Sequence, residues 1–162
     1  MISLGLDSGS SMTKAVLLED MKIIDTKMIP TSISPRKSLE ALYREIKKQH
    51  KEIDVIVTTG YGRNLLDQAD FKITEITCHA AGAFFMNPDC DTIIDIGGQD
   101  SKVITIDDLG CVESICQRTA AFAQKLAPAN PKVFFSGGLA QFDVIKRSLA
   151  SHLGVKEVAT DP

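Results

Sequence analysis

Two short stretches of this 162-residue sequence combine acids, glycines and small polar residues between apolar runs. The stretch DSGSSMTK begins at Asp7, and the stretch DIGGQDSK begins at Asp95. A tight turn containing glycine exposes successive backbone N–H groups, for which phosphate oxygens are suitable acceptors. A carboxylate can lie beside phosphate when a divalent cation or its water intervenes, and Mg²⁺ uses few protein carboxylates. The two stretches therefore indicate a site for a nucleotide with Mg²⁺.

The candidate site residues have different expected roles. Asp7 and Asp95 are expected to hold Mg²⁺ through water and to act in catalysis. Gln99 either positions the attacking water or caps its turn. Lys14 and Lys102 lie in predicted strands, where an outward, solvated lysine is the alternative to phosphate contact. Contacts with ATP or ADP are expected from both turns and from a later glycine pair, namely Gly9, Ser10, Ser11, Thr13, Lys14, Gly97, Gly98, Gly137 and Gly138.

The apolar runs predict the elements that position these residues. Three strands are expected within residues 2–30, then a helix over 35–50 with one apolar face and a basic, solvated face, and a strand over 53–60. Residues 92–112 repeat the opening pattern, and a helix over 113–126 and a strand over 132–136 follow. Such a duplication predicts two similar lobes, residues 1–88 and 89–162, that face each other across a cleft.

Composition excludes several other classes of function. The net charge is −3, and the basic residues form no stripe that would suit nucleic acid. No apolar run approaches a membrane span, and no signal peptide is visible, so a cytoplasmic protein is expected. The glycines match neither the P-loop nor the dinucleotide-binding pattern. Four cysteines lack a C-x-x-C pair, and most are expected to be buried; a metal-ligating role for Cys111 and Cys116 is the alternative.

Five motifs, GLDSGSSMTKAVLL, TTGYGR, TEITCHAAGA, IDIGGQDSKVI and FFSGGLAQ, occur in an order that resembles a known family. It comprises the activator ATPases of 2-hydroxyacyl-CoA dehydratases and the related benzoyl-CoA reductase subunits, in the actin, sugar kinase and heat-shock chaperone superfamily. The resemblance implies an α/β, ribonuclease H-like (actin-like ATPase) fold with two lobes, each a mixed sheet with flanking helices. It also implies a homodimer in which ATP hydrolysis drives an electron from a shared [4Fe-4S] cluster into a partner CoA-ester dehydratase or reductase.

The sequence departs from that family where the cluster cysteines are expected. The segment GCVESICQRT occupies the place of a longer insert, so no iron–sulfur ligands are identified, and either a shortened family member or a trimmed chain is expected. The predicted function is therefore an ATP-binding or ATP-hydrolysing activator. The alternatives are a small-molecule kinase of the same superfamily and a nucleotide-dependent binding module. Arg63 is expected to have a structural or interface role, Glu75 is ambiguous, and His79 is expected to be a satisfied buried histidine.

Overall fold

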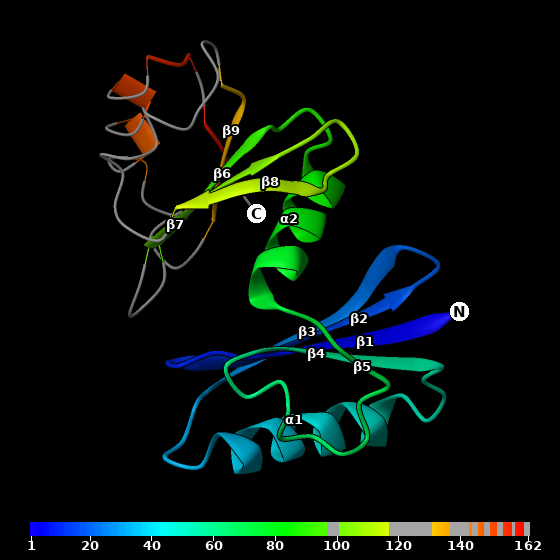
Figure 1. Cartoon of the computed structure of the whole chain (residues 1–162). Coiled ribbons are helices and arrows are strands. Elements are labelled where there is room, and N and C mark those ends of the chain that lie inside the picture. Colours follow the sequence, from blue (N-terminus) through cyan, green and yellow to red (C-terminus); the bar gives the residue numbers. More distant parts are fainter. Residues whose placement is uncertain are drawn as a thin grey trace. The chain divides into compact units, whose positions relative to one another are not determined.

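The computed structural model describes residues 1–96, 101–116, 131–136, 143, 146–147, 150–151, 154–156 and 158–160. The chain divides into two compact units, Met1–Glu75 and Ile76–Pro162. Each unit contains a five-stranded sheet, and Figure 1 shows the sheets with their helices. Each sheet positions one of the acidic turns.

The first sheet has the strand order β3-β2-β1-β4-β5. Its strands are β1 (Ile2–Ser8), β2 (Met12–Glu19), β3 (Lys22–Pro30), β4 (Val55–Gly60) and β5 (Phe71–Lys72). The first three strands form an antiparallel meander, and β4 pairs with β1 in parallel. Asp20 and Met21 both have positive φ, which is the backbone of the two-residue turn that suits a twisted hairpin.

Helix α1 (Pro35–Gln49) covers the apolar face of this sheet. Proline at its first position has the φ that a helix needs and lacks an N–H that would be unpaired there. The spacing of Leu39, Leu42 and Ile46 places all three on one stripe, where they pack with Leu4, Leu6 and Leu17 in the core. The predicted strands of the first half and the helix over 35–50 are confirmed.

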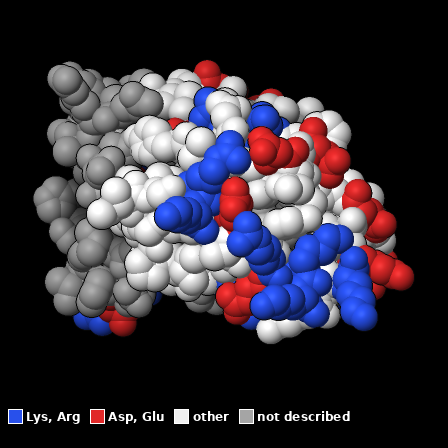
Figure 2. Space-filling view, turned by 90° about the horizontal axis from the view of Figure 1, so that it is seen from below, with Lys and Arg blue, Asp and Glu red and all other residues white. Residues whose placement is uncertain are grey.

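The exposed face of α1 is mixed in charge rather than simply basic. Figure 2 shows Lys and Arg side chains interspersed with Asp and Glu on the face seen from below. Arg36 and Arg44 both lie within ion-pair distance of Glu40, and Lys27 of β3 pairs with Glu45 at 2.7 Å. Side-chain hydrogen bonding to Glu45 raises the pKa of Lys27. These exposed pairs add little stability individually.

The second sheet repeats the first, with the order β10-β9-β6-β7-β8. Its strands are β6 (Thr92–Ile96), β7 (Ser101–Ile106), β8 (Val112–Cys116), β9 (Val133–Ser136) and β10 (Ala159–Thr160). Again three strands form an antiparallel meander, and the next strand, β9, pairs in parallel with the first. The duplication predicted from the sequence is therefore present in the topology.

One predicted element is wrong at its start. Residues 113–116 belong to strand β8 and not to a helix, and the remainder of the predicted helix lies outside the described residues. Ile115 has a spacing that suits a helix with later apolar residues, but its backbone pairs with Ile104 of β7. The pairing with a neighbouring strand overrides the local periodicity.

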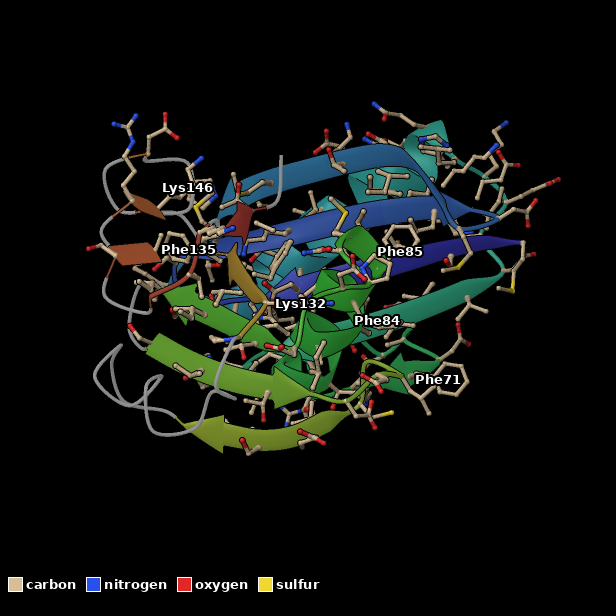
Figure 3. All side chains as sticks on the ribbon, turned by 90° about the horizontal axis from the view of Figure 1, so that it is seen from above. Phe71, Phe84, Phe85, Lys132, Phe135 and Lys146 are labelled. Carbon is tan, nitrogen blue, oxygen red and sulfur yellow. The ribbon has the colours of Figure 1, made fainter. Side chains whose placement is uncertain are left out.

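Helix α2 (Glu75–Met86) packs on one face of the second sheet. Ala80 and Ala83 are buried against Ile93, Ile104 and Phe134. The other face of this sheet has a separate core around Ile94, Val103 and Phe135, which includes Val158 and the partly buried Ala150 and Val155. In Figure 3, Phe84 and Phe85 project from α2, and Phe135 lies on β9. No helix among the described residues is long and apolar enough to span a membrane.

Candidate functional site

The first acidic turn lies at the carboxyl end of β1. Asp7 is paired in register with Lys14 of β2, and Asp7 Oδ2 lies 3.5 Å from Lys14 Nζ. The side chains remain partly exposed, 32% for Asp7 and 54% for Lys14. Lys14 is thus partly solvated, as expected for an outward lysine, and it also balances the charge of the carboxylate. A partly exposed carboxylate beside an ammonium group suits contact with a ligand that carries both phosphate and metal.

Two glycines of the GYGR segment allow the loop after β4 to approach Asp7 closely. Gly60 has φ +81°, and a Cβ there would lie 2.6 Å from both Asp7 Oδ1 and the carbonyl oxygen of Ser8. A Cβ at Gly62 would overlap the hydroxyl of Ser8, which is buried and has no hydrogen-bond partner among the described residues. Only residues without a side chain fit these positions, so the loop follows the backbone of β1 closely.

The turn between β1 and β2 is tied by hydrogen bonds within the first unit. The Gly9 N–H donates to the Met12 carbonyl at 3.1 Å, and the Thr31 hydroxyl donates to the Gly9 carbonyl at 2.9 Å. Thr13 is fully buried, with its hydroxyl 2.9 Å from that of Thr31. Because the Thr31 proton is directed to Gly9, Thr13 donates to Thr31. Both Gly9 and Thr13 thus shape the turn, and their contact with a nucleotide stays a prediction.

The two serines of this turn have a different setting from Gly9 and Thr13. Ser10 and Ser11 are exposed at the tip of the hairpin. The carbonyl of Ser11 accepts a hydrogen bond from the Thr31 N–H at 2.9 Å, which fixes the backbone while the side chain stays in solvent. Their hydroxyl groups are therefore accessible to a ligand, as the sequence predicts for phosphate donors.

The second acidic turn has the same cross-strand pair in a buried setting. Asp95 of β6 is in register with Lys102 of β7, and Asp95 Oδ2 lies 3.9 Å from Lys102 Nζ. Their side chains are only 9% and 6% exposed. Burial of two charged groups has a large desolvation cost, which other polar contacts must offset. Of the two possibilities considered for Lys102, the outward, solvated lysine is wrong, because this face of the sheet is covered.

His79 also belongs to this cluster: it has polar partners, as expected, but a third of its side chain is exposed and not buried. It lies on α2 three residues after Ile76 and four before Ala83, which both pack against this sheet, so its side chain is directed at the sheet. His79 Nε2 lies 2.9 Å from the hydroxyl of Ser136, and Nδ1 lies 3.7 Å from Asp95 Oδ2. The buried Ser136 is the last residue of β9 and is in register with Asp95. The pattern of TEITCHAAGA shows a helix with an inward histidine, but not its partners.

Arg63 contributes to the conformation of the loop after β4. Its guanidinium donates to the Gly60 carbonyl at 3.2 Å, and its own carbonyl accepts from the Thr58 hydroxyl at 2.8 Å. The guanidinium also lies 3.8 Å from Glu75, the first residue of α2. These contacts agree with the structural role expected for Arg63, and they give Glu75 a partner.

Several predicted site residues lie outside the described part of the chain. These are Gln99, Gly97, Gly98, Gly137 and Gly138. Their roles stay predictions, although the described strands β6 and β9 end immediately before the two glycine pairs.

The described cysteines do not fit an iron–sulfur cluster. Cys111 is exposed, Cys78 is half-buried and Cys90 is buried, so the expectation that most cysteines are buried holds for only one of these three. Burial raises the pKa of the Cys90 thiol, which disfavours the thiolate that a metal would need. Among the described residues, no group of three or more His, Cys, Asp and Glu side chains could hold a metal ion. We therefore assign no step to a cluster.

Curated proteins are similar in sequence to about two thirds of this chain. Over 117 residues the chain is 41% identical to the activator of lactoyl-CoA dehydratase from Anaerotignum propionicum, covering 70% of this chain and 45% of that protein. An uncharacterized protein of Escherichia coli, YjiL, is 44% identical over 108 residues, covering 67% of this chain and 42% of that protein. The matched segment thus spans less than half of these curated relatives.

A solved structure extends the similarity to almost the whole chain. The activator of 2-hydroxyisocaproyl-CoA dehydratase from Clostridium difficile, solved with bound ADPNP, superposes with a TM-score of 0.79 at 24% identity. The match covers 99% of this chain and 88% of that one. The prediction of an actin-like fold with two mixed sheets is therefore confirmed. The model of the BadF/BadG/BcrA/BcrD ATPase family matches residues 4–114, and the chain belongs to that family.

Proposed function

We propose that this chain binds Mg-ATP through its two acidic turns and acts as the ATPase component that activates a CoA-ester dehydratase or reductase. The observation that carries the proposal is the repeated Asp–Lys pair, Asp7 with Lys14 and Asp95 with Lys102, at the end of the first strand of each sheet. Membership of an ATPase family and similarity to a dehydratase activator support it.

The donor set of the first turn suits Mg²⁺ with nucleotide phosphates. Asp7 offers carboxylate oxygens that are partly accessible, and Mg²⁺ uses such oxygens while keeping several of its waters. Thr59 of β4, in register with Asp7, has a buried hydroxyl with no hydrogen-bond partner in the described part of the chain. Such an unpaired hydroxyl is costly unless a ligand or water completes it. Asp7, Thr59 and the exposed Ser10 would therefore hold the metal-bound phosphate group.

When bound, Mg²⁺ would neutralise phosphate charge that builds up during phosphoryl transfer. The residues of the chain would orient the nucleotide around it. Lys14, 3.5 Å from Asp7, would donate to a phosphate oxygen while Asp7 holds a water of the metal, and Asp95 with Lys102 offers the same pair in the second unit. In this proposal Gln99 directs the attacking water, and the amides of Gly97 and Gly98 donate to phosphate oxygens. Hydrolysis would then change the affinity for a reductive partner enzyme.

The test is calorimetric titration of the full chain with Mg-ADP and Mg-ATP, compared with Asp7→Ala and Asp95→Ala. We expect each substitution to weaken Mg-nucleotide binding by about 10- to 100-fold, the range for groups that orient a metal through water. Asp67→Ala is the matched control, because Asp67 is exposed and pairs only with Arg36 among the ion pairs of the described residues. It should bind as the unmodified chain does.

Two results would reject the assignment. One is unmodified protein that binds neither nucleotide, and the other is unchanged binding and hydrolysis in both Asp variants. Iron and sulfide analysis of protein purified without oxygen separates the activator proposal from a nucleotide clamp that transfers no electron. A competent activator should contain iron held by cysteine thiolates, whereas iron-free protein with ATP turnover would restrict the function to the ATPase.

A further inference from the structure

A side chain of helix α2 contacts the ends of both strands that carry the candidate site in the second unit. Its His79 side chain contacts Ser136 at the end of β9 through Nε2, at 2.9 Å, and faces Asp95 on β6 through Nδ1, at 3.7 Å. The three residues come from three separate elements and are far apart in sequence. One imidazole therefore touches both of the parallel strands that carry the candidate site.

The residues that His79 contacts are buried, so they depend on polar partners within the protein. Asp95 and Lys102 are over nine-tenths buried, and Ser136 is buried beside them, whereas a third of the His79 side chain is exposed. Buried polar groups need polar partners, and His79 lies within hydrogen-bond distance of Ser136 and within ion-pair distance of Asp95. The Asp95 carboxylate oxygen near Nδ1 favours the tautomer of His79 with its proton on that nitrogen. Nε2 then accepts a hydrogen bond from the Ser136 hydroxyl.

The first unit shows that the fold itself does not require such a histidine. Thr59 occupies the position of Ser136, since it is in register with Asp7 as Ser136 is with Asp95. The Thr59 hydroxyl has no partner within the described residues, yet the first sheet has the same strand order. The contact of His79 is thus an addition to the site of the second unit.

We propose that His79 is a positioning residue, which fixes the Asp95 carboxylate and the Ser136 hydroxyl for metal-dependent nucleotide binding. The inference rests on the proposed function, because Asp95 is assigned there to Mg²⁺ through water. Outer-shell partners that orient the groups around a metal are typically worth 10- to 100-fold in metal affinity. His79 acts in this way without touching the nucleotide itself.

The experiment compares ADP affinity with Mg²⁺ and with EDTA in the full chain. The ratio of the two dissociation constants measures the contribution of the metal. We expect His79→Ala to reduce this ratio about tenfold while the affinity for metal-free ADP stays unchanged. A general loss of structure would weaken both affinities together, so the ratio separates positioning from folding.

Two further variants give the result its controls. His79→Gln keeps an amide near the Nε2 position, which can still pair with Ser136, so it should restore most of the ratio. His50→Ala is the matched control, because His50 pairs with Asp25 at 3.1 Å with similar exposure but belongs to the first unit. It should leave the ratio as it is.

The possible outcomes distinguish this inference from the proposed function. Unmodified protein that fails to bind Mg-ADP rejects the proposed function and the inference together. Normal Mg-ADP binding with an unchanged ratio in His79→Ala rejects the role of His79 alone. An equal fall in His50→Ala also rejects it. If His79→Ala does not fold, His79→Gln and Ser136→Ala decide the question, and a ratio preserved in Ser136→Ala overturns the proposed link.

Discussion

Asp7 and Asp95 occupy equivalent places in two sheets of the same strand order, yet their surroundings differ. Each pairs across its strand with a lysine, at 3.5 Å for Asp7 and 3.9 Å for Asp95. The pair in the first unit is partly exposed, whereas the pair in the second unit is buried. The duplication fixes where the charged groups lie, and the residues packed on each sheet fix how strongly those charges interact.

The burial of the two opening strands explains this difference. Along β1 buried and half-buried residues alternate, which is the pattern of a strand with one face in the core. Along β6 four successive residues are buried, which is the pattern of a strand covered on both faces. Helix α2 packs on the face that carries Asp95, and this helix supplies His79. The same sheet thus supports an open site and a covered one.

The largest effect is expected from Gly60, where the first unit brings its loop against Asp7. Gly60→Ala introduces a Cβ at 2.6 Å from Asp7 Oδ1 and from the Ser8 carbonyl, at a positive φ. We expect the free energy of unfolding to fall by about 4 kcal/mol, from the left-handed backbone and the steric overlap together. Urea unfolding, with hydrogen exchange of β1 and β4, measures this loss.

Gly154 provides the control for Gly60→Ala. It also has a positive φ, +69°, but a Cβ there meets no atom of the described residues within 4 Å. Gly154→Ala should therefore cost only the backbone strain, about 1–2 kcal/mol. Equal losses in the two variants would contradict the close approach of the loop to Asp7.

The next effect compares the buried and exposed charge pairs directly. Asp95→Asn removes a negative charge beside the buried ammonium group of Lys102, and we expect a loss of about 3 kcal/mol. Asp7→Asn removes the same charge beside a half-exposed lysine, and the expected loss is under about 1 kcal/mol. Urea unfolding at two salt concentrations is the measurement. A loss for Asp7→Asn as large as that for Asp95→Asn would show that burial does not distinguish the pairs.

The sequence predicts those parts of the fold that depend on neighbouring residues. The strands of both meanders follow from apolar runs bounded by turn residues, and α1 follows from the spacing of Leu39, Leu42 and Ile46. The equivalence of Lys14 and Lys102 is visible because the duplication preserves their distance from Asp7 and Asp95. Cross-strand register then converts that spacing into contact.

Features that depend on distant residues were not predictable in the same way. His79 and Ser136 are 57 residues apart, so no local pattern indicates their contact. The burial of Lys102 depends on α2, which precedes the strand and reaches its face only in the folded unit. The start of the predicted helix falls on strand β8 because the position of Ile115 fits both the helical and the strand periodicity of apolar residues. Only the backbone pairing with β7 decides between the two.

The smallest effects concern the hydroxyl groups of Thr59 and Ser136. Removing the hydroxyl should change the stability in opposite directions in the two units. Thr59→Val replaces a buried hydroxyl, which is unpaired within the described part of the chain, by a methyl group of similar size, so stability without nucleotide should stay equal or rise by up to about 1 kcal/mol. Ser136→Ala removes the partner of His79 and should cost about 1 kcal/mol. Thermal unfolding with and without Mg-ADP measures both.

If Thr59 also holds the nucleotide, Mg-ADP should stabilise Thr59→Val less than the unmodified chain, because ligand stabilisation follows affinity. A Thr59→Val variant that loses stability without nucleotide would mean that its hydroxyl already has a partner, and the contrast between the two strand ends would then be wrong.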